Sequence, residues 1–222
     1  MTELARTNRS RVKRLPKRGG YDFETVAAIL DAGFLCHVGY VIEGDPYVTP
    51  TSYWREGDHV YWHGSSVSRM LGTLETGTQA CLTVAHIDGL VLARSGFHHS
   101  INYRSVMLFG RAHVVESPAD KERALQNFVE RLYPGRWNEL RPVNRKELNA
   151  TTVLHMKIEE GAAKVRTGPP VDDAEDYDLP IWAGVMPVRM HVEPPVPDDR
   201  LKAAVPVPEY LSDLGHVGLK RS

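Results

Sequence analysis

The sequence predicts a mainly β protein with a few helices, arranged as a closed or nearly closed antiparallel barrel. Many short stretches alternate apolar and polar residues, and turn sequences such as EGDP and REGD separate them. Helical stretches are few, whereas a doubly wound parallel sheet would alternate helices with strands. Hydrophobic residues make up 42% of the 222 residues, which is enough for the core of one large domain.

The first half of the chain supplies a short helix and a meander of strands. The stretch of residues 19–33 predicts a short helix with Asp22 as a suitable N-cap, an apolar face and an end at Gly33. A second short helix is expected over residues 67–78, ending at Gly77. Alternation predicts three strands, near residues 34–42, 47–54 and 58–63.

The second half supplies the remaining strands and the longest helix. Strand-like runs lie on either side of Asp88-Gly89 and again over residues 105–116. Ser117 caps the longest predicted helix, which has a proline at its first position and a continuous apolar face. A last pair of strands is expected over residues 151–168.

The predicted barrel domain covers residues 21–168, and the two ends of the chain differ from it in composition. Residues 1–20 are strongly basic, with Glu3 as the only acidic residue, so we expect a flexible arm. A nucleic-acid arm and a lid over an anionic ligand are the alternatives. Residues 169–222 are rich in proline and acidic residues and predict a mostly irregular extension. Its apolar part, residues 179–190, is expected to pack on the barrel or on a partner subunit.

Composition limits the partners and the compartment. Lys and Arg number 27 against 28 Asp and Glu, and this balance argues against a protein that coats nucleic acid. No run of about 18 apolar residues predicts a membrane span, and no apolar segment follows the basic N-terminus as in a secretory signal. Cys36 and Cys81 are expected to be free thiols. We therefore expect a cytoplasmic protein without nucleic-acid or membrane partners.

Residues 61–70, YWHGSSVSRM, have the composition of an anion-binding loop. Serine hydroxyls can donate to an anion, Gly64 lets the backbone approach, and Arg69 can contact a phosphate through two hydrogen bonds. An ordinary solvated turn has a similar composition, and the P-loop motif is absent. The candidate ligands are His63, Gly64, Ser65, Ser66, Ser68 and Arg69.

A second polar stretch, residues 94–110, connects two apolar strands. Adjacent His98 and His99 suggest a metal, but they would point in opposite directions from a strand, and no third ligand has metal spacing. No metal site is therefore expected. Side chains that line a ligand cleft explain the polar residues more simply, and the candidates are Asn102, Tyr103, Arg104 and Ser105.

A third stretch covers the end of the predicted barrel and the start of the extension. Lys164 and Arg166 alternate on one strand face, and Trp182 lies in an irregular, proline-flanked segment. Trp182 either pins the extension to the barrel or covers a planar ligand. No GxSxG motif or carboxylate pair indicates a nucleophile or a general acid, so no catalytic residue is assigned.

Four segments together resemble one known family: YVTPTSYWREGDHVYWHGSSVSRML, DGLVLARSGFHHSINYRSVMLFGRA, AKVRTGPPVDD and LPIWAGVMPV. The chain resembles the flavin-nucleotide-binding branch of the pyridoxamine 5'-phosphate oxidase-like split-barrel family, which includes nitroimidazole-resistance-type reductases. The resemblance implies a Greek-key split β-barrel homodimer with one FMN in each of two clefts at the dimer interface.

The resemblance also implies roles for the candidate residues. Ser65, Ser66, Ser68 and Arg69 would hold the FMN phosphate. The preceding strand would run along the isoalloxazine ring and contact it largely through backbone groups, at Val48, Thr49, Pro50, Thr51 and Ser52. Asn102, Tyr103, Arg104 and Ser105 would reach the flavin from a neighbouring strand, and Trp182 would cover the ring from the partner subunit. Lys164, Arg166 or the Arg104 region would stabilise the reduced, anionic flavin.

The function implied is that of an FMN-dependent oxidoreductase. It would pass electrons from NADH or NADPH to a small nitro- or quinone-like acceptor, or to oxygen. One alternative is a non-catalytic flavin or haem binder, with His37, His98 or His99 as an axial ligand. A deazaflavin in place of FMN is another. Met70 after Arg69, and Arg189-Met190-His191 before a proline-rich tail, depart from pyridoxamine 5'-phosphate oxidases proper and argue against that activity.

Overall fold

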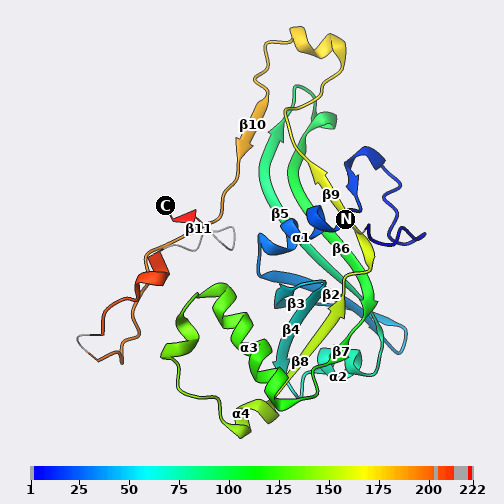
Figure 1. Ribbon diagram of the computed structural model, residues 1–222. Coiled ribbons are helices and arrows are strands. Elements are labelled where there is room, and N and C mark those ends of the chain that lie inside the picture. Colours follow the sequence, from blue (N-terminus) through cyan, green and yellow to red (C-terminus); the bar gives the residue numbers. More distant parts are fainter. Residues whose placement is uncertain (1–2, 203–204, 213–219, 222) are drawn as a thin grey trace.

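The computed structural model describes residues 3–202, 205–212 and 220–221. Ten strands form one antiparallel sheet in the order β1-β9-β6-β5-β2-β3-β4-β8-β7, and β10 pairs with β5 (Figure 1). This mostly antiparallel architecture confirms the predicted fold class. The strands are β1 (Gly19–Gly20), β2 (Leu35–Ile42), β3 (Asp45–Glu56), β4 (His59–Ser65), β5 (Gln79–Leu92), β6 (Ser100–Arg111), β7 (His113–Val114), β8 (Thr151–Lys157), β9 (Glu160–Arg166) and β10 (Gly184–Pro187).

The helices begin where local sequence provides a cap. Asp22 accepts a hydrogen bond from the Thr25 backbone at the start of α1, and Ser117 does the same for α3. Asn144 forms a capping box with Glu147 at the start of α4. The α-helices are α1 (Phe23–Asp31), α2 (Arg69–Glu75), α3 (Pro118–Leu132) and α4 (Arg145–Ala150). Short 3-10 turns are η1 (Pro16–Arg18), η2 (Gly96–His98), η3 (Arg136–Glu139), η4 (Ala174–Asp178) and η5 (Glu209–Ser212).

The core fills the inside of the curved sheet. Apolar side chains from α1 and α2 pack with those of the strands, and Leu30, Leu71 and Trp62 are fully buried there. A smaller cluster lies on the other face of the sheet, where α3 covers Trp54 and Val153. Among the described residues, no helix packs on the rest of that outer face, across β2, β3, β5 and β6.

Strands β5 and β6 extend past the barrel and form a projecting arm with residues 167–187 (Figure 1). The sequence predicts two strands separated at Asp88-Gly89, whereas β5 is continuous and only shifts register between Ile87 and Gly89. Gly89 is needed because β10 runs close beside it: a Cβ there would lie 2.9 Å from Val185 Cγ1. Strand β6 also begins at Ser100, earlier than predicted.

The basic N-terminal segment, for which the composition predicts a flexible arm, contacts the barrel in the described residues. Leu4 is buried and its N–H donates to the Tyr21 carbonyl, while the N–H of Ala5 donates to the Glu159 carbonyl. Arg9 pairs with Glu160 through two hydrogen bonds of 2.7 and 2.6 Å. The segment is ordered along β9 because one apolar anchor and several of its cations find partners on the barrel.

The C-terminal extension has little regular secondary structure in its described residues. Gly184–Pro187 add to the sheet as β10, so the apolar part of the extension packs on β5. Farther along, Tyr210 contacts Arg136 and Glu139 beyond the end of α3, at 2.9 and 2.6 Å. Strands β11 (His191–Val192) and β12 (Lys220–Arg221) form a separate parallel pair. Within the described ranges, no helix has the length and apolar character to span a membrane.

Candidate functional site

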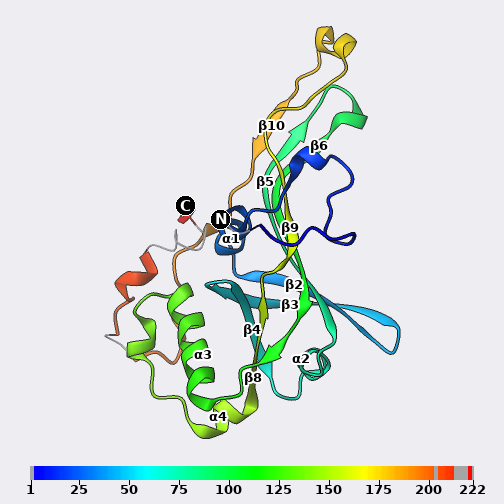
Figure 2. The same ribbon diagram turned by 45° about the vertical axis from the view of Figure 1, so that its right-hand side comes forward.

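The barrel sheet divides along β3. Residues 45–52 of this strand pair with β2, whereas β4 pairs with β3 only from Tyr53 onward. The other edge of residues 45–52 is therefore free of strand partners, and the β2–β3 hairpin projects from the barrel (Figure 2). Strand edges carry backbone groups that can bind a ligand. The candidate residues on this edge are Val48, Thr49, Pro50, Thr51 and Ser52.

The predicted phosphate loop follows β4 as a tight turn. The Ser68 N–H donates to the Ser65 carbonyl at 2.9 Å, and the Ser66 N–H donates to Ala150 at 2.8 Å. These bonds fix the turn and leave the side chains of Ser65 and Ser66 exposed to solvent. Gly64 fits closely under α2, since a Cβ there would lie 3.1 Å from Leu71 Cδ1.

Arg69 connects this loop to the free edge. Its guanidinium carbon lies 4.5 Å from the centre of the Tyr47 ring on β3. No carboxylate lies within ion-pair distance of Arg69 among the described residues, so its charge is available to an anion. The structure thus brings together the loop and the strand that the sequence predicts to hold the phosphate and the ring.

His63 belongs to a different environment. Its ring packs on Phe128 at 4.7 Å and on Trp54 at 5.9 Å between centroids, beneath α3. Burial lowers the pKa of His63, so the imidazole is neutral at pH 7. Cys36 is similarly excluded as a nucleophile, because burial raises the pKa of its thiol to about 12.

Other candidates lie on the uncovered outer face of the sheet. Pro50, His37, Thr83 and Met107 are aligned across four neighbouring strands. Ser105 lies two residues before Met107 on β6, on the same face of the sheet, and pairs with Lys164 on β9. This face is open and partly apolar, with Val48 68% exposed and Met107 44% exposed.

Asn102, Arg104 and Arg166 are committed to contacts within the arm. Arg104 holds Asp88 through two hydrogen bonds of 2.9 Å. Buried Arg166 donates to the side chain of Asn102 and to the Gly168 carbonyl, while Asn102 donates to the same carbonyl at 3.0 Å. Burial, and then Arg18, lower the pKa of Arg166. Tyr103 pairs with Arg166 in the sheet.

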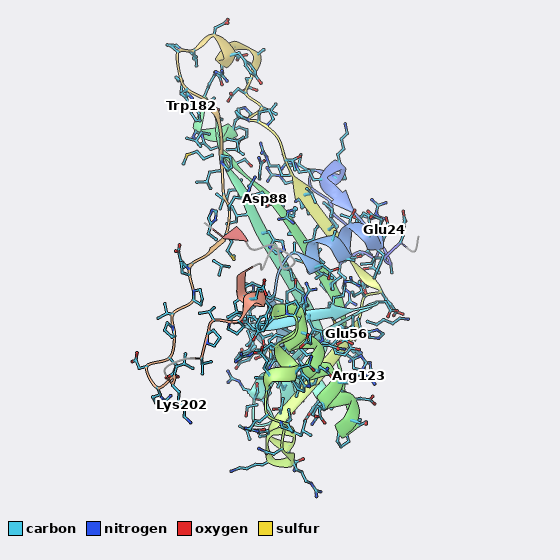
Figure 3. All side chains as sticks on the ribbon, turned by 60° about the vertical axis from the view of Figure 1, so that its left-hand side comes forward. Glu24, Glu56, Asp88, Arg123, Trp182 and Lys202 are labelled. Atoms are coloured by element: carbon cyan, nitrogen blue, oxygen red, sulfur yellow. The ribbon has the colours of Figure 1, made fainter. Side chains whose placement is uncertain are left out.

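Trp182 lies far from the phosphate loop of its own chain. It is labelled near the far end of the arm in Figure 3, whereas α2 lies at the opposite end of the molecule in Figure 1. The indole is 67% exposed and rests on Gly184, where a Cβ would lie 2.9 Å from the ring. A single chain therefore leaves the predicted site in two separate parts.

The sequence did not predict the buried ion pair between Asp172 and Arg94 inside the arm. Asp172 belongs to the acid-rich extension that the sequence predicts to be mostly irregular, yet its side chain is fully buried. Its carboxylate accepts hydrogen bonds from the backbone and the guanidinium of Arg94, both at 3.0 Å. Arg94 also lies over the Tyr177 ring. The sequence signal was Arg94 itself, a lone cation between two apolar strands, but its partner lies 78 residues away.

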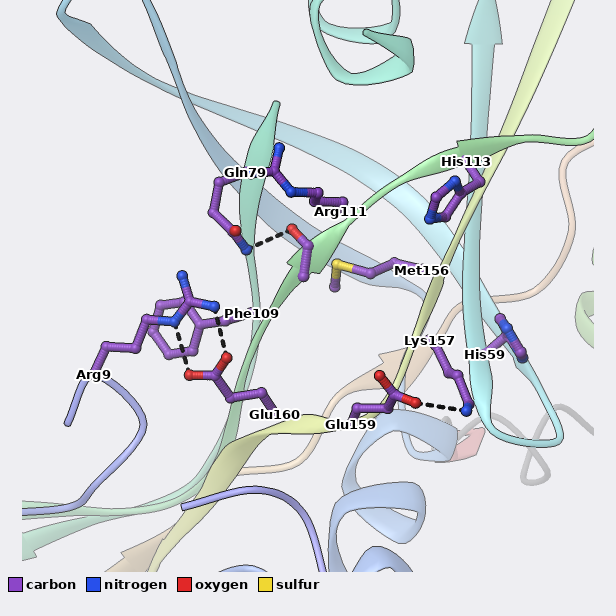
Figure 4. Close-up of a pocket in the computed structure, with 11 residues that line it drawn as sticks. Arg9, His59, Gln79, Phe109, Arg111, His113, Met156, Lys157, Glu159 and Glu160 are labelled. Atoms are coloured by element: carbon purple, nitrogen blue, oxygen red, sulfur yellow. Dashed lines mark hydrogen bonds and ion pairs between the residues drawn. The ribbon is translucent and has the colours of Figure 1, made fainter. Parts of the chain in front are cut away.

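A polar cavity of about 450 Å³ lies between the N-terminal segment and residues of β4, β5, β6, β7, β8 and β9 (Figure 4). Arg9 and Lys157 line it, but each is paired with a glutamate, Lys157 with Glu159 at 2.5 Å. Arg111 donates to a backbone carbonyl outside the cavity. The cations that line the cavity are already paired with a carboxylate or hydrogen-bonded. The cavity is therefore a weaker candidate for anion binding than the loop at Arg69.

Comparison with known proteins agrees with this architecture. The flavocytochrome Anf3 from Azotobacter vinelandii is 53% identical, with a TM-score of 0.89 over 92% of this chain and 95% of that chain. A protein from Mycobacterium smegmatis described as FAD and heme binding is 34% identical, with a TM-score of 0.85 over 90% of this chain and 98% of that one. Searching the curated proteins gave no match.

A more distant structure shares the fold alone. A protein from Bacteroides thetaiotaomicron described with 5-nitroimidazole antibiotic resistance is 21% identical, with a TM-score of 0.56 over 66% of this chain and 86% of that chain. The family model described as pyridoxamine 5'-phosphate oxidase matches residues 22–165, which is most of the barrel. The chain therefore belongs to the pyridoxamine 5'-phosphate oxidase-like split-barrel family.

Proposed function

We propose that this chain binds a flavin and works as an oxidoreductase, with the phosphate of the FMN moiety held at the loop of residues 64–69. The observation that carries the proposal is Arg69, a cation without a carboxylate partner in the described part of the chain, set between exposed serine hydroxyls and the free edge of β3. FMN and FAD share this phosphate. The relatives described as a flavocytochrome and as FAD and heme binding support a flavin of either kind.

The residues present fit such a group. The serines and Arg69 would bind the phosphate, and the unpaired backbone of β3 would orient the ring. Lys164 lies on the same open face as Ser105 and would stabilise negative charge on the ring. A bound flavin would supply hydride or electron transfer, for which we propose NADH or NADPH as donor and a small nitro- or quinone-like molecule, or oxygen, as acceptor.

The direct test is spectroscopic. We expect the purified chain to be yellow, or to become so with FMN or FAD, and mass spectrometry of the released cofactor identifies which flavin it holds. Flavin absorbance should fall when NADH or NADPH is added without oxygen. A chain that takes up neither flavin would overturn the proposal. A chain that binds flavin but is not reduced would support flavin binding and contradict NADH and NADPH as the electron donor.

We further propose that two copies form the complete site, with Trp182 of one chain covering the flavin held by the other. The exposed indole and the uncovered outer face support this arrangement. Arg69→Ala and Trp182→Ala chains should each bind flavin weakly. Refolded together, they should regain tight binding at about one site per two dimers in total, because about half of the dimers are mixed and each mixed dimer has one intact site. Mixtures that gain no tight binding would contradict a shared site.

Haem binding is a second candidate function. It is favoured because the two relatives reported above, at 53% and 34% identity, are described as a flavocytochrome and as FAD and heme binding. Haem would give the chain a second redox group beside the flavin. We expect a Soret band after haemin is added to the purified chain. A chain with no such band, and no haem after expression with added haem precursor, would exclude this function.

A further inference from the structure

A cavity of about 510 Å³ separates the barrel from the start of the C-terminal extension. It lies between residues 32–35 after α1, residues 85–88 at the β5 register shift, and residues 188–190 after β10. Its walls are largely apolar, and His86, Asp88, Arg104 and Arg189 are the ionisable residues that line it. Its size falls in the range of small-molecule and cofactor sites, about 300–1,000 Å³.

His86 is held in a fixed orientation on the wall of this cavity. Its Nε2 lies 2.9 Å from the Ile29 carbonyl oxygen at the end of α1. The ring rests directly on Gly33, where a Cβ would lie 2.5 Å from His86 Cε1. Among the described residues Nδ1 has no hydrogen-bond partner. A histidine that binds a metal through one nitrogen usually has its other N–H bonded to a carbonyl, which is the arrangement found here.

The other described histidines lack this combination. His59, His113 and His155 stack on one another against polar surroundings. His63 is enclosed by aromatic rings without a cavity. His98 faces Asp173 at 3.3 Å in the arm. The remaining three are exposed and line none of the described cavities: His37, His99 and His191.

The mouth of the cavity carries the charge that a haem requires. Haem has an apolar plate and two carboxylates, so its site needs apolar walls and cations at one side. Arg189 has no carboxylate partner in the described residues and donates only to the neighbouring Val188 carbonyl. The Val188 N–H donates to the Asp88 carbonyl at 3.1 Å, which holds this segment against the cavity.

We propose that this cavity is the haem site and that His86 supplies an axial ligand through Nδ1, with Arg189 at the carboxylates. The proposal rests on the haem function stated above. It assigns the ligand to a residue outside the His37, His98 and His99 set that the sequence suggests.

The test is haemin titration of the full flavin-loaded chain, followed by the Soret band. His86→Ala should weaken haem binding by about 100-fold or more, since even the loss of a residue that only orients a metal ligand costs about 10–100-fold. Gly33→Ala keeps the imidazole but displaces it, and should weaken binding by about 10-fold. His37→Ala and His99→Ala are matched controls and should bind within about twofold of the wild type.

Rescue by added imidazole distinguishes the loss of the haem ligand from a general loss of folding. His86→Gly leaves a cavity that added imidazole can fill, and imidazole should restore the position of the Soret band. Flavin binding, measured on the same samples, should be unchanged in the His86, Gly33 and His99 variants. A wild-type chain without haem would defeat the haem function, whereas unchanged haem affinity in His86→Ala would defeat only this site. Loss of the Soret band in His37→Ala or His99→Ala would also overturn the assignment.

Discussion

At the scale of single residues, Arg69 and His63 are neighbours in sequence with opposite environments. Arg69 is exposed beside the β3 edge, and His63 is packed beneath α3. Arg69→Ala removes a charged hydrogen-bond donor worth about 1.5–3 kcal/mol, so flavin affinity should fall by about 10–100-fold. His63→Ala should lower thermal stability and change flavin affinity much less. Titration by flavin fluorescence measures both, and equal losses would contradict the assignment of the phosphate to Arg69.

Two histidines should make the chain sensitive to acid. Burial, and then His59 and His113, lower the pKa of His155, and burial lowers that of His63. The unfolded chain therefore binds more protons below about pH 6.5, and the free energy of unfolding decreases as the pH falls through this value. The melting temperature should drop by several degrees between pH 7 and pH 5. His155→Gln should reduce the drop, and exposed His99→Gln should leave it unchanged; an equal drop in both would exclude His155 as the cause.

The residues of the candidate site were only partly predictable. Ser65, Ser66 and Arg69 could be found because a loop's composition is local. The hydrogen bonds that Arg104 and Arg166 make within the arm could not be predicted. Their partners depend on the long-range register of the strands and on the shift in β5 between Ile87 and Gly89. The sequence gives the residue types of a binding site, and tertiary pairing decides which of them remain available.

At the scale of elements, the order of the arm depends on the buried ion pair between Asp172 and Arg94. Burial acts to raise the pKa of this carboxyl, but the hydrogen bonds from Arg94 outweigh it and lower the pKa. Asp172→Asn removes the charge that Arg94 needs, so residues 166–183 should exchange amide hydrogens and be cleaved by protease faster. Glu175→Gln, an exposed neighbour, is the matched control. Equal protection of both variants would show that β10 alone orders the arm.

Helices and strands differed in how well the sequence predicted them. Helices α1 and α3 were predicted correctly because Asp22 and Ser117 act within one turn of their own position. The contacts of the N-terminal segment could not be predicted, because its composition does not show that Leu4 is buried or that Arg9 pairs with Glu160. Pro46 and Pro50 were a signal that could have marked the unpaired edge of β3 at residues 45–52.

At the scale of the whole molecule, the uncovered outer face predicts association. Val48 is largely exposed on the same face as Met107, beside the proposed flavin site. Val48→Glu places charge on this face and should convert a dimer into monomers, with loss of tight flavin binding. Val196→Glu, at a position on the extension that is 91% exposed, should remain dimeric. Light scattering measures both, and a wild-type monomer that binds flavin tightly would refute the shared site.

The two prolines of β3 have a consequence for the chain before any ligand binds. Unpaired strand edges recruit other strands and promote aggregation. Proline has no N–H to offer an incoming strand, and Pro46 and Pro50 both lie in the part of β3 that β4 leaves unpaired. Newly synthesised chains should therefore resist edge-to-edge aggregation before they bind the flavin. Replacing both prolines with threonine should increase insoluble protein mainly in flavin-starved cells, which solubility assays with and without riboflavin would detect.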